Sequence, residues 1–294
     1  LHDWNKFMGV YGTYQLPFES LEKLTAIATE ITNEILTFET SLHIPVTQKT
    51  IPQNIIDLKT YIKEQREYRT YLQNLSIKQA VHKDYSKIHE TIESLTDIYT
   101  HNKTKLAKKL SIELEKWTNV ALNILNDAVL IKPNSPVGDD NEPVYTAPSG
   151  VPDIECYYHS FNAICEVTML TNREQWYNEG QPVMRHLRDF ESANANLPAY
   201  CLFVAPTLHK DTINTFYVSV KYEYEGKQQR IIPITIPQLK LILQVVQTRL
   251  MQDKPFIHNY IKQLYDDCVN LSDVRDSTQW LSKIDHTITN WAGQ

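Results

Sequence analysis

Two acidic residues, Asp153 and Glu166, lie in short β-type runs, 153–158 and 163–168, that a brief turn joins. This pattern predicts a β-hairpin. If the centre of the turn follows His159, paired residues have numbers that sum to 319, and Asp153 then lies directly opposite Glu166. Directly paired side chains have Cβ atoms about 4.5 to 5.5 Å apart, so both carboxylates could bind one divalent ion.

Two carboxylates at that separation raise each other's pKa unless a cation lies between them, and the hairpin contains no Lys or Arg. A hard cation such as Mg²⁺, which Mn²⁺ can replace, resolves this conflict. A metal ion so placed polarises a phosphoryl oxygen, lowers the pKa of bound water and stabilises the leaving 3′ oxygen of a phosphodiester. The pair therefore predicts hydrolysis of a nucleic-acid backbone. In the alternative interpretation, Asp153 only begins a strand and Glu166 is an edge or surface residue, with no metal between them.

The elements that position this pair are predicted from the apolar pattern. The opposite face of the hairpin is apolar and suits a core: Ile154, Cys156, Cys165 and Val167. Further β-type runs occur at 200–205 and 231–235, and helical stretches at 173–193, 211–220, 237–252, 256–271 and 276–291. We expect an α/β (α+β) fold with a mixed sheet flanked by helices, in which residues 131–294 form the catalytic core.

The upstream half has a different pattern. From residue 19 to 127, apolar residues recur at spacings of three and four, as in Leu24, Ile27 and Ile31, which predicts helices almost throughout. We expect residues 1–130 to form a helical arm or bundle. The stretch 132–150 contains four prolines and an acidic run, so it is predicted to be a long connection of the kind that is often functional.

Composition limits the class of protein. The chain has 294 residues, 42% of them hydrophobic, which allows one or two compact units. No stretch approaches roughly 20 uncharged apolar residues and no signal peptide is recognisable, so we expect a cytoplasmic protein without a membrane span. The four cysteines form no CxxC pair and no zinc-type cluster with histidine, so neither a disulfide framework nor a structural zinc site is indicated.

The formal net charge of −6 argues against a protein that holds nucleic acid by bulk electrostatics. Affinity for DNA would have to come from elsewhere. Because the chain begins at Leu1 rather than Met, we expect that an N-terminal partner domain is missing from it.

The succession of motifs along the chain resembles the AlwI-type family of restriction and nicking endonucleases. The motifs are Pro152-Asp153, Glu166 to Thr168, Glu179 to His186, Tyr200 to Pro206 and Arg230 to Pro233, and the likeness extends upstream to Tyr11-Gly12 and Leu16-Pro17. The resemblance implies a fold of the PD-(D/E)xK nuclease class. It also implies the cleavage half of a type IIS-like enzyme of a restriction-modification system, a type II site-specific deoxyribonuclease that cuts double-stranded DNA with Mg²⁺.

The same resemblance extends the site. The usual class pattern has a lysine two residues after the second acid, where this chain has Thr168. By match to the family, Glu179 and His186 complete the catalytic site and Glu115 is a further metal ligand. Each has an ordinary alternative: Pro182 suits a first helical turn, so Glu179 could simply precede a helix, His186 could be a structural histidine, and Glu115 could be a solvated acid.

Basic residues offer phosphate contacts. Arg185 and Arg188 lie beside His186, near the proposed site. Four lysines on the helix before the long connection could contact phosphates or form a solvated face: Lys103, Lys105, Lys108 and Lys109.

Two other hypotheses remain open. The chain could be a non-catalytic assembly subunit whose long helices pair with a partner while the nuclease fold is degenerate. It could also be a phosphoesterase acting on RNA or small nucleotides, which ranks last because no phosphate-binding glycine loop is present. A single active site cuts one strand, so double-strand cleavage would require a homodimer or a second nuclease subunit. Whether the enzyme nicks or cuts both strands is left open.

Overall fold

The computed structural model describes most of the chain. The described residues are 20–46, 49–83, 86–102, 104–105, 109–125, 128–138, 142–252 and 258–292. Tyr11-Gly12, Leu16-Pro17, Lys103 and Lys108, which the sequence analysis singled out, lie outside them. The chain packs as two compact units, Leu1–Ser76 and Ile77–Gln294. None of the helices within these described ranges is long and apolar enough to cross a membrane.

The first unit is built on α2 (Leu21–Ser41) and the first part of α3 (Ile55–Lys83). Hydrogen bonds join Thr32 to Tyr61 and Glu39 to Tyr68, and both pairs are 29 residues apart, so the two helices run in the same direction. Their buried residues recur at helical spacing and form one core: Leu24, Ala28, Ile31, Ile35, Leu58, Ile62 and Leu72. The predicted helical pattern is confirmed here.

The second unit contains a five-stranded sheet in the order β1-β2-β3-β4-β5. The strands are β1 (Leu130–Pro133), β2 (Ile154–Tyr157), β3 (Asn162–Val167), β4 (Ala199–Ala205) and β5 (Ile231–Thr235). The first three strands pair antiparallel and the last three pair parallel, so the predicted mixed sheet is confirmed. The sequence pattern did not predict β1, because its four residues end in Pro133 and resemble the start of the proline-rich connection. Proline is tolerated in such an edge strand.

The β2–β3 hairpin has the predicted register. Ile154 pairs with Cys165 and Tyr157 with Asn162, so partner numbers sum to 319. Asp153 lies immediately before β2 and not within it, which shortens the predicted strand. The expected polar face is not solvated, because β3 lies between β2 and β4 and its residues from Asn162 to Glu166 are all buried. A central strand covered on both faces is apolar almost throughout.

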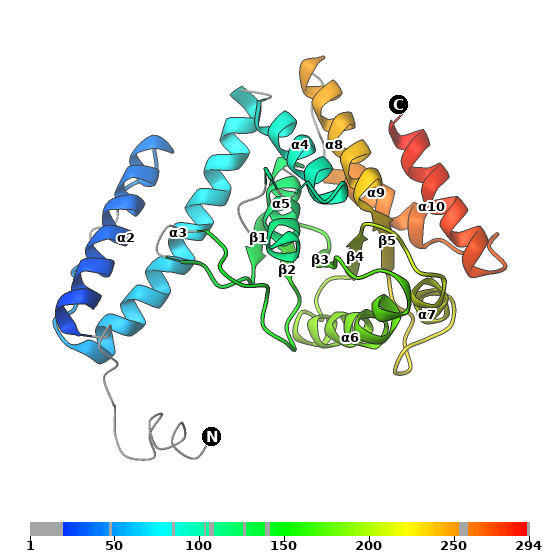
Figure 1. Ribbon diagram of the computed structural model, residues 1–294, viewed down its shortest axis with the longest axis horizontal. Coiled ribbons are helices and arrows are strands. Elements are labelled where there is room, and N and C mark those ends of the chain that lie inside the picture. The colour runs from blue at the N-terminus through cyan, green and yellow to red at the C-terminus, as the bar shows by residue number, and fades with distance from the viewer. Residues whose placement is uncertain are drawn as a thin grey trace. The chain divides into compact units, whose positions relative to one another are not determined.

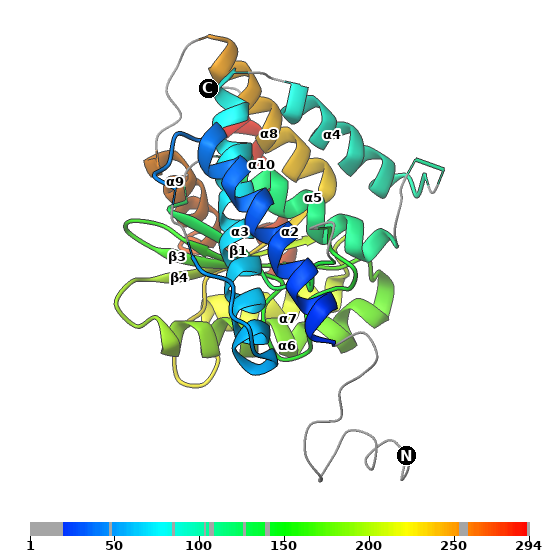
Figure 2. The same ribbon diagram turned by 90° about the vertical axis from the view of Figure 1, so that its left-hand side faces the viewer.

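Helices cover both faces of the sheet (Figures 1 and 2). On one side, α6 (Asn172–Ala193) and α7 (Lys210–Lys221) pack against each other and the sheet, and on the other side are α5 (Leu110–Ile124) and α8 (Ile236–Met251). The remaining helices are α4 (Ser86–Tyr99), α9 (His258–Val269) and α10 (Ser277–Ala292). Of these, α4 packs on α5 and α8. Both α4 and α5 thus belong to the unit that contains the sheet.

Candidate active site

Asp153 lies where the chain enters β2. Its Oδ2 accepts a hydrogen bond from the backbone N–H of Val167 at 2.7 Å, and its own carbonyl accepts one from the backbone N–H of Asn134 at 2.9 Å. Val167 follows Glu166 at the end of β3. The strand pairing ends at Ile154 and Cys165, and Asp153 contacts the end of β3 through its side chain, so the two acids of the sequence prediction lie at one end of the hairpin.

Glu166 lies on the central strand, and α6 supplies its partner. His186 Nδ1 lies 2.9 Å from Glu166 Oε1, and the two side chains are only 12% and 7% exposed. When the carboxylate is ionised, Nδ1 donates and the other ring nitrogen carries a lone pair. That nitrogen, Nε2, is buried and has no hydrogen-bond partner among the described residues. The ring is therefore oriented by the sheet and presents an unused acceptor.

Glu179 lies on the same helix as His186, seven residues earlier, so the two side chains share one face. The helix runs through Pro182 without a break, and the interpretation that Glu179 only precedes a helix is wrong. The Thr168 side chain, as a hydrogen-bond donor, lowers the pKa of the Glu179 carboxylate, and its hydroxyl accepts a hydrogen bond from the backbone N–H of Leu170 at 3.0 Å. Thr168 thus favours the ionised form of one of the acids.

Glu115 comes from α5 and is 3% exposed, so the interpretation of a solvated acid is wrong. Its Oε2 accepts hydrogen bonds from the Ser135 hydroxyl and from the backbone N–H of Ala147, the latter at 3.0 Å. Both donors belong to the proline-rich connection between β1 and β2. The apolar stripe did not reveal this burial, because α5 is covered on nearly all sides by α4, α8, the sheet and this connection.

The four acids influence one another electrostatically. Burial raises the pKa of Asp153 well above its usual range, and the carboxylates of Glu166, Glu115 and Glu179 raise it further. Burial likewise raises the pKa of Glu166, with contributions from Glu179 and Glu115. Burial lowers the pKa of His186, with a contribution from the Arg185 charge. The structure therefore places the four acids within electrostatic range of one another, with His186 in contact with Glu166, and the ionised forms of the acids need a cation.

The chemistry of the donor set fits a hard divalent cation. Carboxylate oxygens are the ligands that Mg²⁺ prefers, and Asp153 Oδ1 and Glu115 Oε1 accept no hydrogen bond from the described residues. As placed, no three His, Cys, Asp or Glu side chains in the described part of the chain gather closely enough to hold a metal. A pair of these carboxylates would suffice for Mg²⁺, which commonly binds one or two carboxylates and completes its shell with water and phosphate oxygens.

The arginines near the site have different surroundings. Arg188 donates to the Glu191 carboxylate and to the carbonyls of Tyr224 and Lys227, so its guanidinium is engaged within the fold. Arg185 is exposed on the same helix. Only Arg185 of the two is therefore available to a phosphate.

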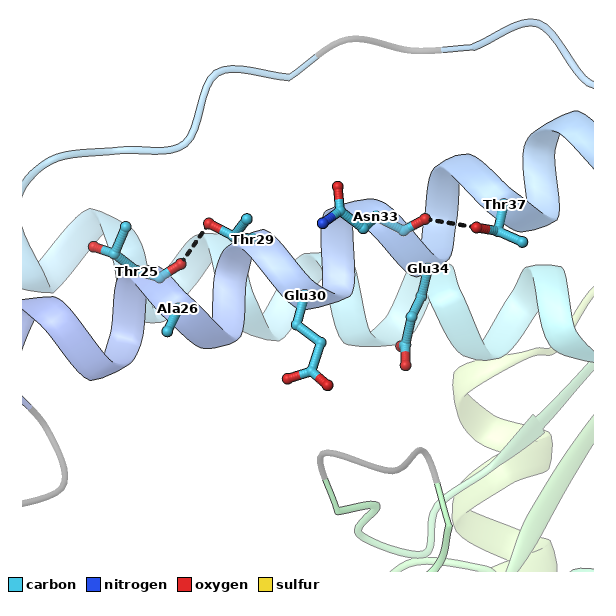
Figure 3. A pocket seen from close by; sticks show the side chains of 7 residues that line it. All are labelled: Thr25, Ala26, Thr29, Glu30, Asn33, Glu34 and Thr37. Atoms are coloured by element: carbon cyan, nitrogen blue, oxygen red, sulfur yellow. Dashed lines mark hydrogen bonds between the residues drawn. The ribbon is translucent and has the colours of Figure 1, made fainter.

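A separate hollow lies on α2 in the first unit (Figure 3). It is lined by one face of that helix: Thr25, Ala26, Thr29, Glu30, Asn33, Glu34 and Thr37. The hydroxyls of Thr29 and Thr37 donate to carbonyls of their own helix. The lining contains two carboxylates and no basic residue, so the hollow does not suit a phosphate.

Three partners of the acids were not predicted from the sequence: Ser135, Asn134 and the amide of Ala147. The only sign in the sequence was the length of the connection that contains them. Hydroxyl and amide donors of this kind become recognisable only when the acceptor's position is known.

Comparisons with known proteins agree with this fold and with the motif resemblance. A family model described as AlwI restriction endonuclease matches residues 2–242. The fold is similar to the crystal structure of the small subunit of the heterodimeric restriction endonuclease R.BspD6I, with a TM-score of 0.54 and 20% identity, covering 67% of this chain and 98% of that chain. No curated protein matches the chain. Because the family model spans most of the sequence, the chain belongs to the AlwI restriction endonuclease family.

Proposed function

We propose that the chain is a magnesium-dependent endodeoxyribonuclease, the cleavage part of a type IIS-like restriction or nicking enzyme of the PD-(D/E)xK class. One observation carries the proposal. Four acids from α5, the β2–β3 hairpin and α6 raise one another's pKa, Glu115 and Glu166 being buried and Asp153 and Glu179 partly exposed, and a divalent cation would relieve their repulsion. A strongly perturbed group of this kind, together with its family, supports an active site.

In this proposal Asp153 and Glu166 hold Mg²⁺ or Mn²⁺, and Glu115 is a further ligand. When bound, the ion would polarise a phosphoryl oxygen and lower the pKa of attacking water. Phosphodiester hydrolysis would leave 5′-phosphate and 3′-hydroxyl ends.

In the proposal, the remaining residues accept a proton, stabilise the resulting charge or contact the phosphate. The lone pair of His186 Nε2 is suited to accept a proton from the attacking water, because Glu166 fixes the ring through Nδ1 and would stabilise the charged imidazolium. Glu179 would stabilise the same charge, because its carboxylate raises the pKa of His186. The exposed Arg185 on α6 would contact the scissile phosphate.

Affinity for double-stranded DNA has to come in part from outside the acidic cluster, since the chain carries a formal charge of −6. We propose that a recognition domain or a partner subunit supplies it. The similar solved structure belongs to a heterodimeric enzyme, which supports the idea that a second nuclease subunit or a second copy cuts the other strand.

The test is cleavage of supercoiled plasmid in Mg²⁺ with Asp153→Asn and Glu166→Gln. Each variant keeps the side-chain shape and should lose at least about 100-fold in rate, because changes to residues that only support a metal ligand already cost about 10 to 100-fold. Glu174→Gln, which changes an exposed acid on α6, should cut like the wild type. Undiminished cutting by Asp153→Asn would refute the assignment.

Calorimetric titration with Mg²⁺ or Mn²⁺ separates the proposal from a non-catalytic assembly subunit. The nuclease should bind the ion, and Asp153→Asn should bind it far more weakly. A wild-type protein that gives no binding heat and cuts no DNA would instead favour the assembly role.

A further inference from the structure

Asn134, which directly follows β1, holds the segment that carries Asp153. Its backbone N–H donates to the Asp153 carbonyl at 2.9 Å. Its side-chain amide donates to the Pro152 carbonyl at 2.8 Å and to Glu155 Oε1 at 3.1 Å. Asn134 thereby contacts three residues at the start of β2: Pro152, Asp153 and Glu155.

The next residue, Ser135, holds a different acid. Its side chain is buried at 9% exposure, and its hydroxyl donates to Oε2 of Glu115 on α5. The backbone N–H of Ala147 donates to the same oxygen at 3.0 Å. Because both donors share Oε2, they orient the carboxylate and leave Oε1 without a hydrogen bond from the described residues.

Two consecutive residues therefore connect two acids that come from separate elements. Consecutive Cα atoms are held about 3.8 Å apart by a planar peptide, and both side chains are short, so little slack lies between the contacts. We propose that Asn134 and Ser135 are positioning residues that set the Glu115 carboxylate relative to Asp153 for a shared divalent cation. This inference rests on the proposed function of the acidic cluster.

A purely structural role would give a different outcome. Ser135 could merely satisfy a buried polar group, in which case its loss would lower stability and leave cation affinity unchanged. Ser219 provides a matched control, because it is 2% exposed and its hydroxyl donates to the Phe216 carbonyl on α7. Losing either hydroxyl removes one buried hydrogen bond, and only one of the two contacts an acid of the site.

The experiment is calorimetric titration of the full chain with Mn²⁺ and Mg²⁺, for the wild type, Ser135→Ala, Ser135→Thr and Ser219→Ala. We expect Ser135→Ala to bind about 10-fold or more weakly, as is usual when the hydrogen-bond partner of a metal ligand is lost. Ser135→Thr retains the hydroxyl and should bind within a few-fold of the wild type. Ser219→Ala should match the wild type, and thermal unfolding verifies that each variant is folded.

Asn134→Ala provides a second, independent variant. It removes the contacts to Pro152 and Glu155 while the backbone contact to Asp153 remains, so we expect a smaller loss of affinity than for Ser135→Ala. In cleavage assays, both variants should need more Mg²⁺ for half-maximal rate and should approach the wild-type rate when the ion saturates.

The outcomes are distinguishable. If the wild type binds the ion and Ser135→Ala binds it equally well, the positioning role is wrong and the proposed function stands. Equal losses in Ser135→Ala and Ser219→Ala would also overturn it, since they would reflect general destabilisation. A wild type that binds neither ion and cuts no DNA would overturn the proposed function, and the inference with it.

Discussion

Helix α6 contributes an acid to each of two charged clusters, which differ in whether cations lie beside the acids. Near its C-terminal end, the Glu191 carboxylate is 5% exposed and lies near three cations, Arg188, Lys227 at 3.4 Å and Arg230 at 3.9 Å. Seven residues before His186, Glu179 belongs to a cluster in which acids face other acids. The first cluster contains its own counter-charges.

This difference distinguishes charged residues that stabilise the fold from charged residues that bind a ligand. A buried acid that is paired within the fold fastens elements together, as Glu191 and Arg188 fasten α6 to the turn at Tyr224 and Lys227. Buried acids without such partners cost free energy unless a ligand supplies the charge. We therefore expect added cations to stabilise the acidic cluster. The Glu191 cluster should instead lose stability when one of its own charged residues is replaced.

The largest expected effect on stability comes from breaking the paired cluster. Glu191→Gln leaves the buried Arg188 guanidinium without its carboxylate, and removing one partner of a buried ion pair costs roughly 3 kcal/mol or more. Urea unfolding should show this loss. Glu90→Gln, which breaks the exposed ion pair with Lys87, should cost less than about 1 kcal/mol. Similar costs for the two variants would contradict the comparison.

The acidic cluster, unlike the Glu191 cluster, should gain stability when a divalent cation is added. At an Mg²⁺ concentration 100 times its Kd, binding to the native state adds about 2.7 kcal/mol to the free energy of unfolding. Thermal unfolding with and without Mg²⁺ should show this gain for the wild type and for Glu191→Gln, provided that the latter is folded. Glu166→Gln should gain much less. An equal gain for Glu166→Gln would place the stabilising ion elsewhere.

Much of this architecture could be predicted from the sequence because its pattern is local. The hairpin register followed from where the turn lies, and the four predicted strands followed from runs of β-branched and aromatic residues. The edge strand β1 could not be predicted, since its four residues owe their conformation to pairing with β2.

The site was only partly predictable, because a sequence pattern reveals contacts between residues that are close in sequence and not those that depend on tertiary packing. Asp153 and Glu166 belong to one hairpin, so their meeting is a local property. The burial of Glu115 depends on packing between α5 and elements distant in sequence, and a helical pattern alone shows only one apolar stripe. Glu179 and His186 were placed at the site by family resemblance, and their contacts with Thr168 and Glu166 became clear only in three dimensions.

A smaller effect concerns pH. Burial and neighbouring acids raise the pKa of Glu166, so the folded protein without metal binds a proton that the unfolded chain releases at lower pH. Stability from this residue is therefore present below the ordinary carboxyl pKa and is lost as pH rises toward the raised pKa. The stability advantage of Glu166→Gln over the wild type should grow over this interval in chelator. Unfolding measured across pH should show the growth, and saturating Mg²⁺ should abolish it.

The smallest expected effect tests how the acidic cluster is held in place without cations of its own. Thr168→Val keeps the shape of the side chain and removes the hydroxyl that lowers the pKa of Glu179 as a hydrogen-bond donor. One such bond contributes about 1 kcal/mol to stability, and freeing the carboxylate should slow single-turnover DNA cleavage by about 10-fold. Thr168→Ser retains the hydroxyl and should cut at nearly the wild-type rate. If Thr168→Val also cut at that rate, the orientation of the Glu179 carboxylate would not matter for cleavage. Binding of the cation that the mutual repulsion of the acids favours would then suffice to organise the site.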